Sequence, residues 1–200
     1  KVMAKGGSFE REISSILSKW WTGGARDDIF YRSSSSGGRF TARYKRGKQT
    51  ADHHGDICSI DVCGKPLTDT FSIELKTGYS GRRKEKTGKV SIINWCVLDI
   101  LDSRQTLPVL LKMWEQSSRD ASRSEKLPLL IFRRPLLSPN ITMEERVFLS
   151  LGAHFDNVPE KRIAIHTADY SLVVFSLKDF FTWVNGEVFC CLLTEKNIVF

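Results

Sequence analysis

The segment from Phe71 to Lys76 alternates apolar and polar residues, and this period of two predicts a β-strand with one buried face. The apolar side chains share that face, and Ser72, Glu74 and Lys76 share the opposite one. A carboxylate and an ammonium group therefore lie on the same side of one short strand. The chemistry that this polar face supports depends on which other charged residues lie next to Glu74 and Lys76.

A second alternating segment, residues 56–63, precedes this strand and predicts an antiparallel hairpin with it. The Gly-Lys-Pro sequence between the two segments suits a turn. If the hairpin is centred on Lys65, Asp56 lies directly across from Glu74, with the two Cβ atoms about 5 Å apart. Asp56, Glu74 and Lys76 then converge at the open end of the hairpin. A register shift of one residue would separate them.

Two carboxylates held side by side on a sheet repel each other, and stability alone gives no reason for this arrangement. A divalent cation between them removes the repulsion, and oxygen ligands favour Mg²⁺ or Mn²⁺. Lys76 can hold a water molecule or a phosphate oxygen beside that metal. Together these groups suit the hydrolysis of a phosphodiester. The structural alternative is a salt-bridged hairpin end without a metal.

The positive charge of the chain is concentrated in two stretches on either side of these residues. Residues 39–48 carry five basic side chains and no acidic one. Residues 76–89 carry six basic side chains and one acidic side chain. Because the formal net charge is +7, the rest of the chain has a net charge of −3. This pattern indicates a polyanionic partner, nucleic acid before a membrane surface, since the stretches lack an amphipathic apolar face. The candidate nucleic-acid-binding residues in them are Arg39, Arg43, Lys45, Arg46, Lys48, Arg82, Arg83, Lys84 and Lys86.

The remaining composition is that of an ordinary globular protein. With 200 residues, 41% of them hydrophobic, the chain can bury a core, and we interpret residues 1–200 as a single domain with a basic insertion at 38–54. No apolar run approaches the roughly 18 residues of a membrane span. The five cysteines are an odd number without a Cys-x-x-Cys pair, which favours a reduced, cytoplasmic protein without structural zinc or disulfides.

Apolar residues at helical spacing near the N-terminus predict an amphipathic helix, with Ser8 as its N-cap and Gly23-Gly24 as its end. Later segments predict helices near 95–102 and 107–117, strands at 129–132, 163–166 and 172–175, a helix starting at a capping box at 142–145, and a last helix over 176–184 that Asn185-Gly186 ends. The apolar stripe of the first helix consists of Phe9, Ile13, Ile16, Leu17 and Trp20.

In these residues the chain resembles the PD-(D/E)xK nuclease superfamily, whose signature is an acid at the start of one strand and acid-x-lysine on the next. Asp56 after Gly55, and Glu74-Leu75-Lys76, match it. The run from Lys5 to Glu12 is similar to the opening helix of the archaeal-type Holliday-junction resolvases in that superfamily, and Tyr31-Arg32-Ser33 continues the similarity. The resemblance implies a restriction-endonuclease-like α/β fold, with a central mixed β-sheet entered through an antiparallel meander and flanked by helices.

The resemblance also implies a role for each matching residue. Asp56 and Glu74 would be metal ligands, with the main-chain carbonyl of Leu75 as a third. Glu10 would reach the Mg²⁺ or Mn²⁺ ion directly or through water. Lys76 would position or activate the attacking water and stabilise the developing charge.

From the same resemblance we expect a Mg²⁺-dependent endodeoxyribonuclease that resolves Holliday junctions in DNA recombination and repair. Arg32 and Ser33 would contact DNA near the scissile phosphate. Because a four-way junction is cut symmetrically on two strands, we expect a homodimer.

Two other functions fit the same residues. One is a restriction-type or DNA-processing nuclease that cuts duplex DNA, and the other is a DNA-binding module of the same fold without catalysis. The sequence Asp52-His53-His54 spells the motif of the DHH phosphoesterases, but the other acidic motifs of that family are absent. We therefore interpret these three residues as polar loop residues near DNA.

Overall fold

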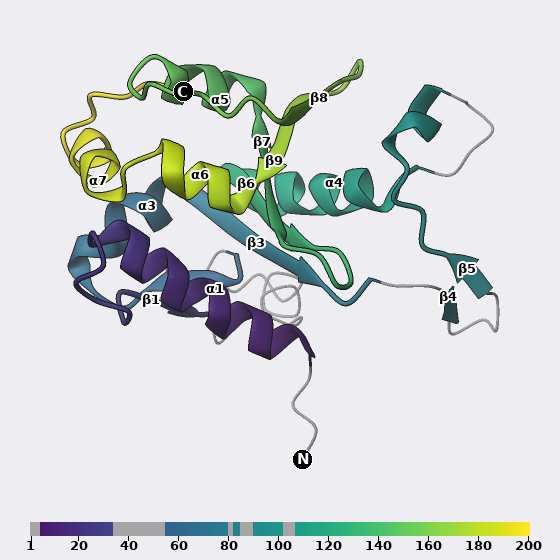
Figure 1. Cartoon of the computed structure of the whole chain (residues 1–200), viewed down its shortest axis with the longest axis horizontal. Helices are drawn as coiled ribbons and strands as arrows, with labels where there is room; N and C mark the ends of the chain where they lie inside the picture. The colour runs from purple at the N-terminus through teal and green to yellow at the C-terminus, as the bar shows by residue number, and fades with distance from the viewer. Residues whose placement is uncertain (1–4, 34–54, 80–81, 85–89, 102–106) are drawn as a thin grey trace.

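The chain folds into an α/β structure around one five-stranded mixed sheet, as the sequence predicts (Figure 1). The structure is a computed structural model and describes residues 5–33, 55–79, 82–84, 90–101 and 107–200. In chain order the elements are α1 (Lys5–Trp21), β1 (Phe30–Arg32), β2 (Ile57–Ser59), the 3₁₀ helix η1 (Val62–Gly64), α3 (Lys65–Thr70), β3 (Phe71–Thr77), β4 (Arg82–Lys84), β5 (Val90–Ile92), the 3₁₀ helix η2 (Val97–Leu101), α4 (Val109–Ser122), β6 (Leu127–Arg133), β7 (Pro139–Glu144), α5 (Glu145–Gly152), β8 (Arg162–His166), β9 (Ser171–Ser176), α6 (Leu177–Trp183) and α7 (Gly186–Thr194).

The five strands follow the order β3-β6-β7-β9-β8. β3 and β6 are parallel, whereas β6-β7, β7-β9 and β9-β8 are antiparallel. A parallel pair needs a crossover connection, which α4 provides here. In the β3-β6 register, Glu74 lies beside Leu130 and Lys76 beside Phe132.

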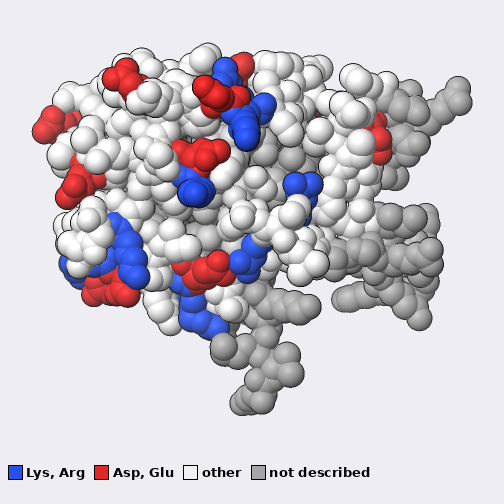
Figure 2. All heavy atoms as spheres, viewed as in Figure 1, with Lys and Arg blue, Asp and Glu red and all other residues white. Residues whose placement is uncertain are grey.

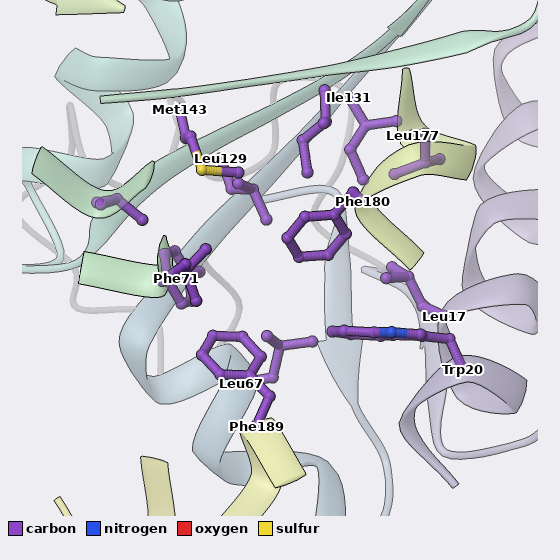
Figure 3. Close-up of a pocket in the computed structure, with 13 residues that line it drawn as sticks. Leu17, Trp20, Leu67, Phe71, Leu129, Ile131, Met143, Leu177, Phe180 and Phe189 are labelled. Atoms are coloured by element: carbon purple, nitrogen blue, oxygen red, sulfur yellow. The ribbon is translucent and has the colours of Figure 1, made fainter. Parts of the chain in front are cut away.

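Two apolar cores lie on the opposite faces of this sheet. The larger core joins α1, α3, α5, α6 and α7 to the face onto which Phe71 and Ile73 point. The smaller core joins α4 to the other face, where it buries Leu130 and Phe132. Side chains alternate along a strand, so Glu74 points to the α4 face. Figure 3 shows part of the larger core, a small apolar pocket that is lined by α1, α3 and α6 among other elements.

The predicted N-terminal helix is present as α1, with two differences in detail. It begins at Lys5, so Ser8 lies inside the helix and does not cap it. It ends where predicted, because Gly23 and Gly24 adopt positive φ angles (58° and 92°) and Gly24 N–H donates to Lys19 O at 2.7 Å. Ile16 belongs to the predicted stripe but is 38% exposed.

The predicted hairpin between residues 56–63 and β3 is wrong. β2 pairs with β1 in a separate two-stranded ladder, where Tyr31 lies beside Cys58. The Gly-Lys-Pro sequence starts a helix instead of a turn, since Pro66 occupies the first turn of α3, where its missing N–H costs no hydrogen bond. Asp61 caps the preceding helix η1 by accepting a hydrogen bond from Cys63 N–H at 3.0 Å.

In the C-terminal half the predicted strands and helices are present, but two helix boundaries differ and two elements are additional. Residues 142–144 are the end of β7, so they do not form a capping box for α5, whose N-cap is Glu144. Asn185 begins a helix as well as following one, because its side chain accepts a hydrogen bond from Val188 N–H at the start of α7. The sequence predicted neither β7 nor α7. No helix in the described ranges combines the length and apolar character needed to cross a bilayer.

Two isoleucines of α1 test this packing. Ile13 is fully buried, and Ile16, one turn later, is partly exposed. We expect Ile13→Ala to lower the free energy of unfolding by about 2–5 kcal/mol through the cavity it leaves. Ile16→Ala serves as the matched control and should cost less than about 1 kcal/mol. Chemical denaturation measures both values, and equal losses would contradict the orientation of α1.

Candidate active site

The predicted site residues meet at the outer edge of β3, where α1, the end of β1 and the start of β2 come together. In Figure 1, α1 and β1 lie alongside β3 at this edge of the sheet. α1 packs against both β1 and β3. These contacts join segments that are far apart in sequence.

Asp56 is attached to β3 by its backbone and by its side chain. Its N–H donates to Ile73 O at 2.8 Å, and its carboxylate Oδ2 accepts the N–H of Leu75 at 2.9 Å. On the other side, Ser33 N–H donates to Asp56 O at 2.7 Å. Asp56 therefore links the end of β1 to β3, and its carboxylate is held beside Glu74-Leu75-Lys76.

Gly55 explains how Asp56 can come so close to β3. Its φ is +83°, a conformation that side-chain-bearing residues rarely adopt. A Cβ atom at this position would lie 2.6 Å from Ile73 O and 2.9 Å from Ile73 N. Because the backbone of β3 is held by its pairing with β6, these atoms cannot move aside, and glycine is required immediately before the acid.

Glu74 and Lys76 form an ion pair in which Lys76 Nζ donates to Glu74 Oε1. Only 11% of the Glu74 side chain and 13% of the Lys76 side chain are exposed. Burial opposes protonation of Lys76, but the charges of Glu74 and Asp56 outweigh it, so the pKa of the Lys76 ammonium lies above its ordinary value. The strand thus presents a buried pair of opposite charges on the α4 face.

The surroundings of Asp56 disfavour its charged form. Burial raises its pKa to about 7, and the neighbouring charge of Glu74 adds to this effect. The hydrogen bond from Leu75 and the charge of Lys76 act in the opposite direction. Glu10 contributes a further, smaller repulsion, which places its carboxylate in the same electrostatic environment.

Glu10 reaches the site from α1 and pairs with Arg32. Its Oε2 lies 2.9 Å from Arg32 Nε, and 15% of the Glu10 side chain is exposed. Oε2 is buried and accepts no well-aligned hydrogen bond, so this contact is an ion pair without hydrogen-bond geometry. Gly7 makes room for the guanidinium, since a Cβ there would lie 2.9 Å from Arg32 Nη1.

The structure therefore brings four predicted residues together, namely Glu10, Asp56, Glu74 and Lys76. Arg32 joins them through Glu10. Ser33 is fully buried, and its contact with Asp56 is through the backbone. The predicted nucleic-acid-binding residues Arg39, Arg43, Lys45, Arg46, Lys48 and Lys86 lie outside the described residues, as do Asp52-His53-His54 and the basic insertion at 38–54. Arg82, Arg83 and Lys84 form β4, which pairs with β5.

The donor groups at this edge fit a small divalent cation. Both main-chain groups of a strand residue point to the same edge, and the N–H of Leu75 faces Asp56, so the Leu75 carbonyl faces that edge too. Two carboxylates and one carbonyl are oxygen donors, and Mg²⁺ binds to few such groups while it retains water molecules. Within the described ranges, no group of three His, Cys, Asp or Glu side chains is arranged to hold a metal ion.

Two neighbours of the site were not predicted from the sequence. Tyr79 follows β3 closely enough for its phenol to affect the pKa of Lys76. Arg133, at the end of β6, lies over the ring of Phe9 at 4.4 Å and pairs with Glu12 at 2.9 Å. Glu12 belongs to the N-terminal run that carries the resemblance, and its pairing with the end of β6 is a contact that no local pattern indicates.

A model of a protein family, described as "Phage putative PDDEXK endonuclease", matches residues 1–190. The chain belongs to this family. Its membership confirms the predicted PD-(D/E)xK superfamily and the restriction-endonuclease-like fold, and it makes the chain an endonuclease of a metal-dependent class. The closer similarity to Holliday-junction resolvases stays a prediction. Comparisons with curated proteins and with solved structures give no match.

The surface of this family member carries mixed charge in the described residues. Figure 2 shows acidic and basic side chains next to one another over the visible face, without a broad area of one sign among the described residues. The excess of positive charge lies in the stretches 39–48 and 76–89. The described site itself is acidic, with three carboxylates and two basic groups.

Asp56→Asn tests the electrostatics of the site. At pH 8 in EDTA, we expect this variant to raise the melting temperature by about 2–4 °C, the shift expected for roughly 1 kcal/mol in a chain of this size. The reason is that Asn keeps an oxygen for the Leu75 N–H but removes a buried negative charge beside Glu74. Thermal denaturation with and without Mg²⁺ or Mn²⁺ should show stabilisation of the wild type that this variant lacks.

The matched control is Asp69→Asn, which neutralises an exposed carboxylate on α3. It should leave both the melting temperature and the response to the cation unchanged. If Asp56→Asn responds to the cation as strongly as the wild type does, Asp56 is not a ligand.

Proposed function

We propose that the chain hydrolyses DNA phosphodiesters with Mg²⁺ or Mn²⁺ at the edge of β3. The observation that supports this most strongly is the fixation of the Asp56 carboxylate on the Leu75 N–H, directly beside Glu74 and Lys76. A structural salt bridge would need Glu74 and Lys76 alone. The additional buried carboxylates of Asp56 and Glu10 raise the energy of the site, and a bound cation would offset that cost.

In this proposal Asp56, Glu74 and the carbonyl of Leu75 hold the cation, with Glu10 as a further ligand, directly or through water. When bound, the cation acts as a Lewis acid on the phosphate and lowers the pKa of the attacking water. Lys76 positions that water and holds a phosphate oxygen. Its ammonium is then placed where negative charge develops in the transition state.

Arg32 and Ser33 have different parts in the proposed site. The Arg32 side chain is 34% exposed and lies beside Glu10, so it can approach a phosphate while remaining next to the carboxylates. Ser33 supports Asp56 through its backbone N–H, although we predicted that it contacts DNA. The candidates Arg39, Arg43, Lys45, Arg46, Lys48, Arg82, Arg83, Lys84 and Lys86 would provide contacts with the DNA backbone on both sides of the site in sequence.

Glu74→Gln tests the proposed chemistry. It preserves the size of the side chain but removes the charge that would bind the cation, so we expect the cleavage rate to fall on the order of 100-fold or more. The assay is cleavage of labelled DNA in Mg²⁺ and in Mn²⁺. Glu115→Gln, on the exposed surface of α4, is the control and should cleave at the wild-type rate. Equal cleavage by Glu74→Gln and wild type would place the active site elsewhere.

We further propose that the substrate is a four-way junction and that each 200-residue chain is one domain of a homodimer. With equal concentrations of substrate, the wild type should then cut a four-way junction in preference to a duplex or flap with the same arms, and should cut two strands of the junction symmetrically. In solution the protein should have twice the mass of one chain. Cutting of duplex DNA at a fixed sequence would instead indicate a restriction-type or processing nuclease. Salt-sensitive binding without cleavage would indicate a DNA-binding module.

A further inference from the structure

The turn between β6 and β7 presents a fully exposed leucine in a strained backbone conformation. Leu136 has a relative exposure of 104%, and its neighbour Leu137 is also largely exposed, at 47%. The φ of Leu136 is 62°, in the left-handed region. Neither burial nor backbone preference accounts for a leucine at this position.

The hydrogen bonding of the turn makes the choice of residue more unusual. Leu137 N–H donates to Arg134 O at 3.2 Å, so residues 134–137 form a β-turn. Pro135 takes the second position and Leu136 the third, where a positive φ favours glycine. Glycine would relieve the strain and remove an apolar side chain from water. The chain instead keeps a leucine at the tip.

The base of this turn lies next to the candidate active site. In the parallel register, Phe132 lies beside Lys76 and Arg133 beside Thr77. Strands lie about 4.8 Å apart and each residue extends the chain by at most about 3.6 Å, so Leu136 lies within about 20 Å of Lys76. Figure 1 shows the connection from β6 to β7 next to the end of β3.

The base of the turn is fixed, and a basic residue lies next to its tip. Arg133 is held by Glu12 at 2.9 Å and by the ring of Phe9 at 4.4 Å, both on α1. Arg134 follows directly and is exposed. An apolar tip with an adjacent guanidinium suits DNA, in which base faces are apolar and phosphates are anionic. Leu149, another exposed leucine, lies within the regular helix α5 and has neither the turn nor the positive φ.

We propose that Leu136 inserts between two stacked base pairs of the bound DNA, close to the phosphate that is cut. Apolar side chains that enter a base step in this way unstack it and kink the duplex. The energy of unstacking is smallest where the DNA is already distorted or unpaired. This inference rests on the proposed DNA nuclease function, and it adds a physical reason for the enzyme to prefer branched or mismatched DNA over regular duplex.

The test uses the full chain in EDTA, so that DNA is bound without cleavage, and DNA in which single adenines are replaced by the fluorescent analogue 2-aminopurine. Unstacking increases the fluorescence of this base. We expect the wild type to increase it at one step of a duplex and at the branch point of a four-way junction. Leu136→Gly should lose this increase, while its melting temperature equals or exceeds that of the wild type because the strain at φ 62° is gone.

Leu136→Ala should lose the fluorescence increase. Leu149→Ala, which truncates an exposed leucine elsewhere, is the matched control and should keep it. If Leu136→Gly retains the full increase, the proposal is overturned. The proposal for Leu136 is also overturned if the wild type binds DNA without any fluorescence change and cleaves it after Mg²⁺ is added. In that case the nuclease function stands. If the wild type neither binds DNA in EDTA nor cleaves it after Mg²⁺ is added, both the nuclease function and the inserted leucine are overturned.

Discussion

The site depends on the way Asp56 is attached to β3. One residue uses its N–H, its carbonyl and its carboxylate to join Ile73, Ser33 and Leu75. These contacts join the end of β1 and the start of β2 to the edge of the central sheet by hydrogen bonds, next to the core that Phe30 and Ile57 share with Ile73. The attachment requires Gly55, because the backbone of β3 passes within 2.6 Å of the place where a Cβ would be. The same contacts that build this edge of the sheet thus place the carboxylate next to Glu74 and Lys76.

The attachment has an electrostatic cost, and this cost distinguishes the site from a structural ion-pair network. Among the described residues, Lys76 pairs with Glu74 and Arg32 pairs with Glu10, whereas Asp56 forms no ion pair of its own. Its pKa of about 7 reflects the burial of the carboxylate and the repulsion from Glu74. Buried charges are normally paired, so such a carboxylate on a glycine-dependent backbone indicates a site shaped by binding rather than by stability.

Local patterns in the sequence predicted the elements well and their pairing less well. The alternation of residues 71–76 and the helical spacing from Phe9 correspond to β3 and α1. Residues 56–63 also alternate, but pairing is non-local, and the pattern cannot distinguish β1 from β3 as the partner of β2. Asp56 nevertheless meets Glu74, through main-chain contacts next to Gly55 rather than through a hairpin register. The Glu12–Arg133 pair joins residues 121 positions apart, and no periodicity predicts such a contact.

Positive charge is concentrated in residues 39–48 and 76–89, whereas the rest of the chain is slightly acidic. Outside the two basic stretches the chain has a net charge of −3, and the described site contains three carboxylates against two basic groups, so this region on its own repels phosphate. In the proposed function, the attraction for DNA comes from residues 39–48 and 76–89, and such attraction is long-range and weakened by salt. Such attraction brings the polymer close without fixing its position. An apolar residue at a rigid turn beside β3 acts only at contact and is insensitive to salt, so Leu136 can fix the position that the basic segments leave open.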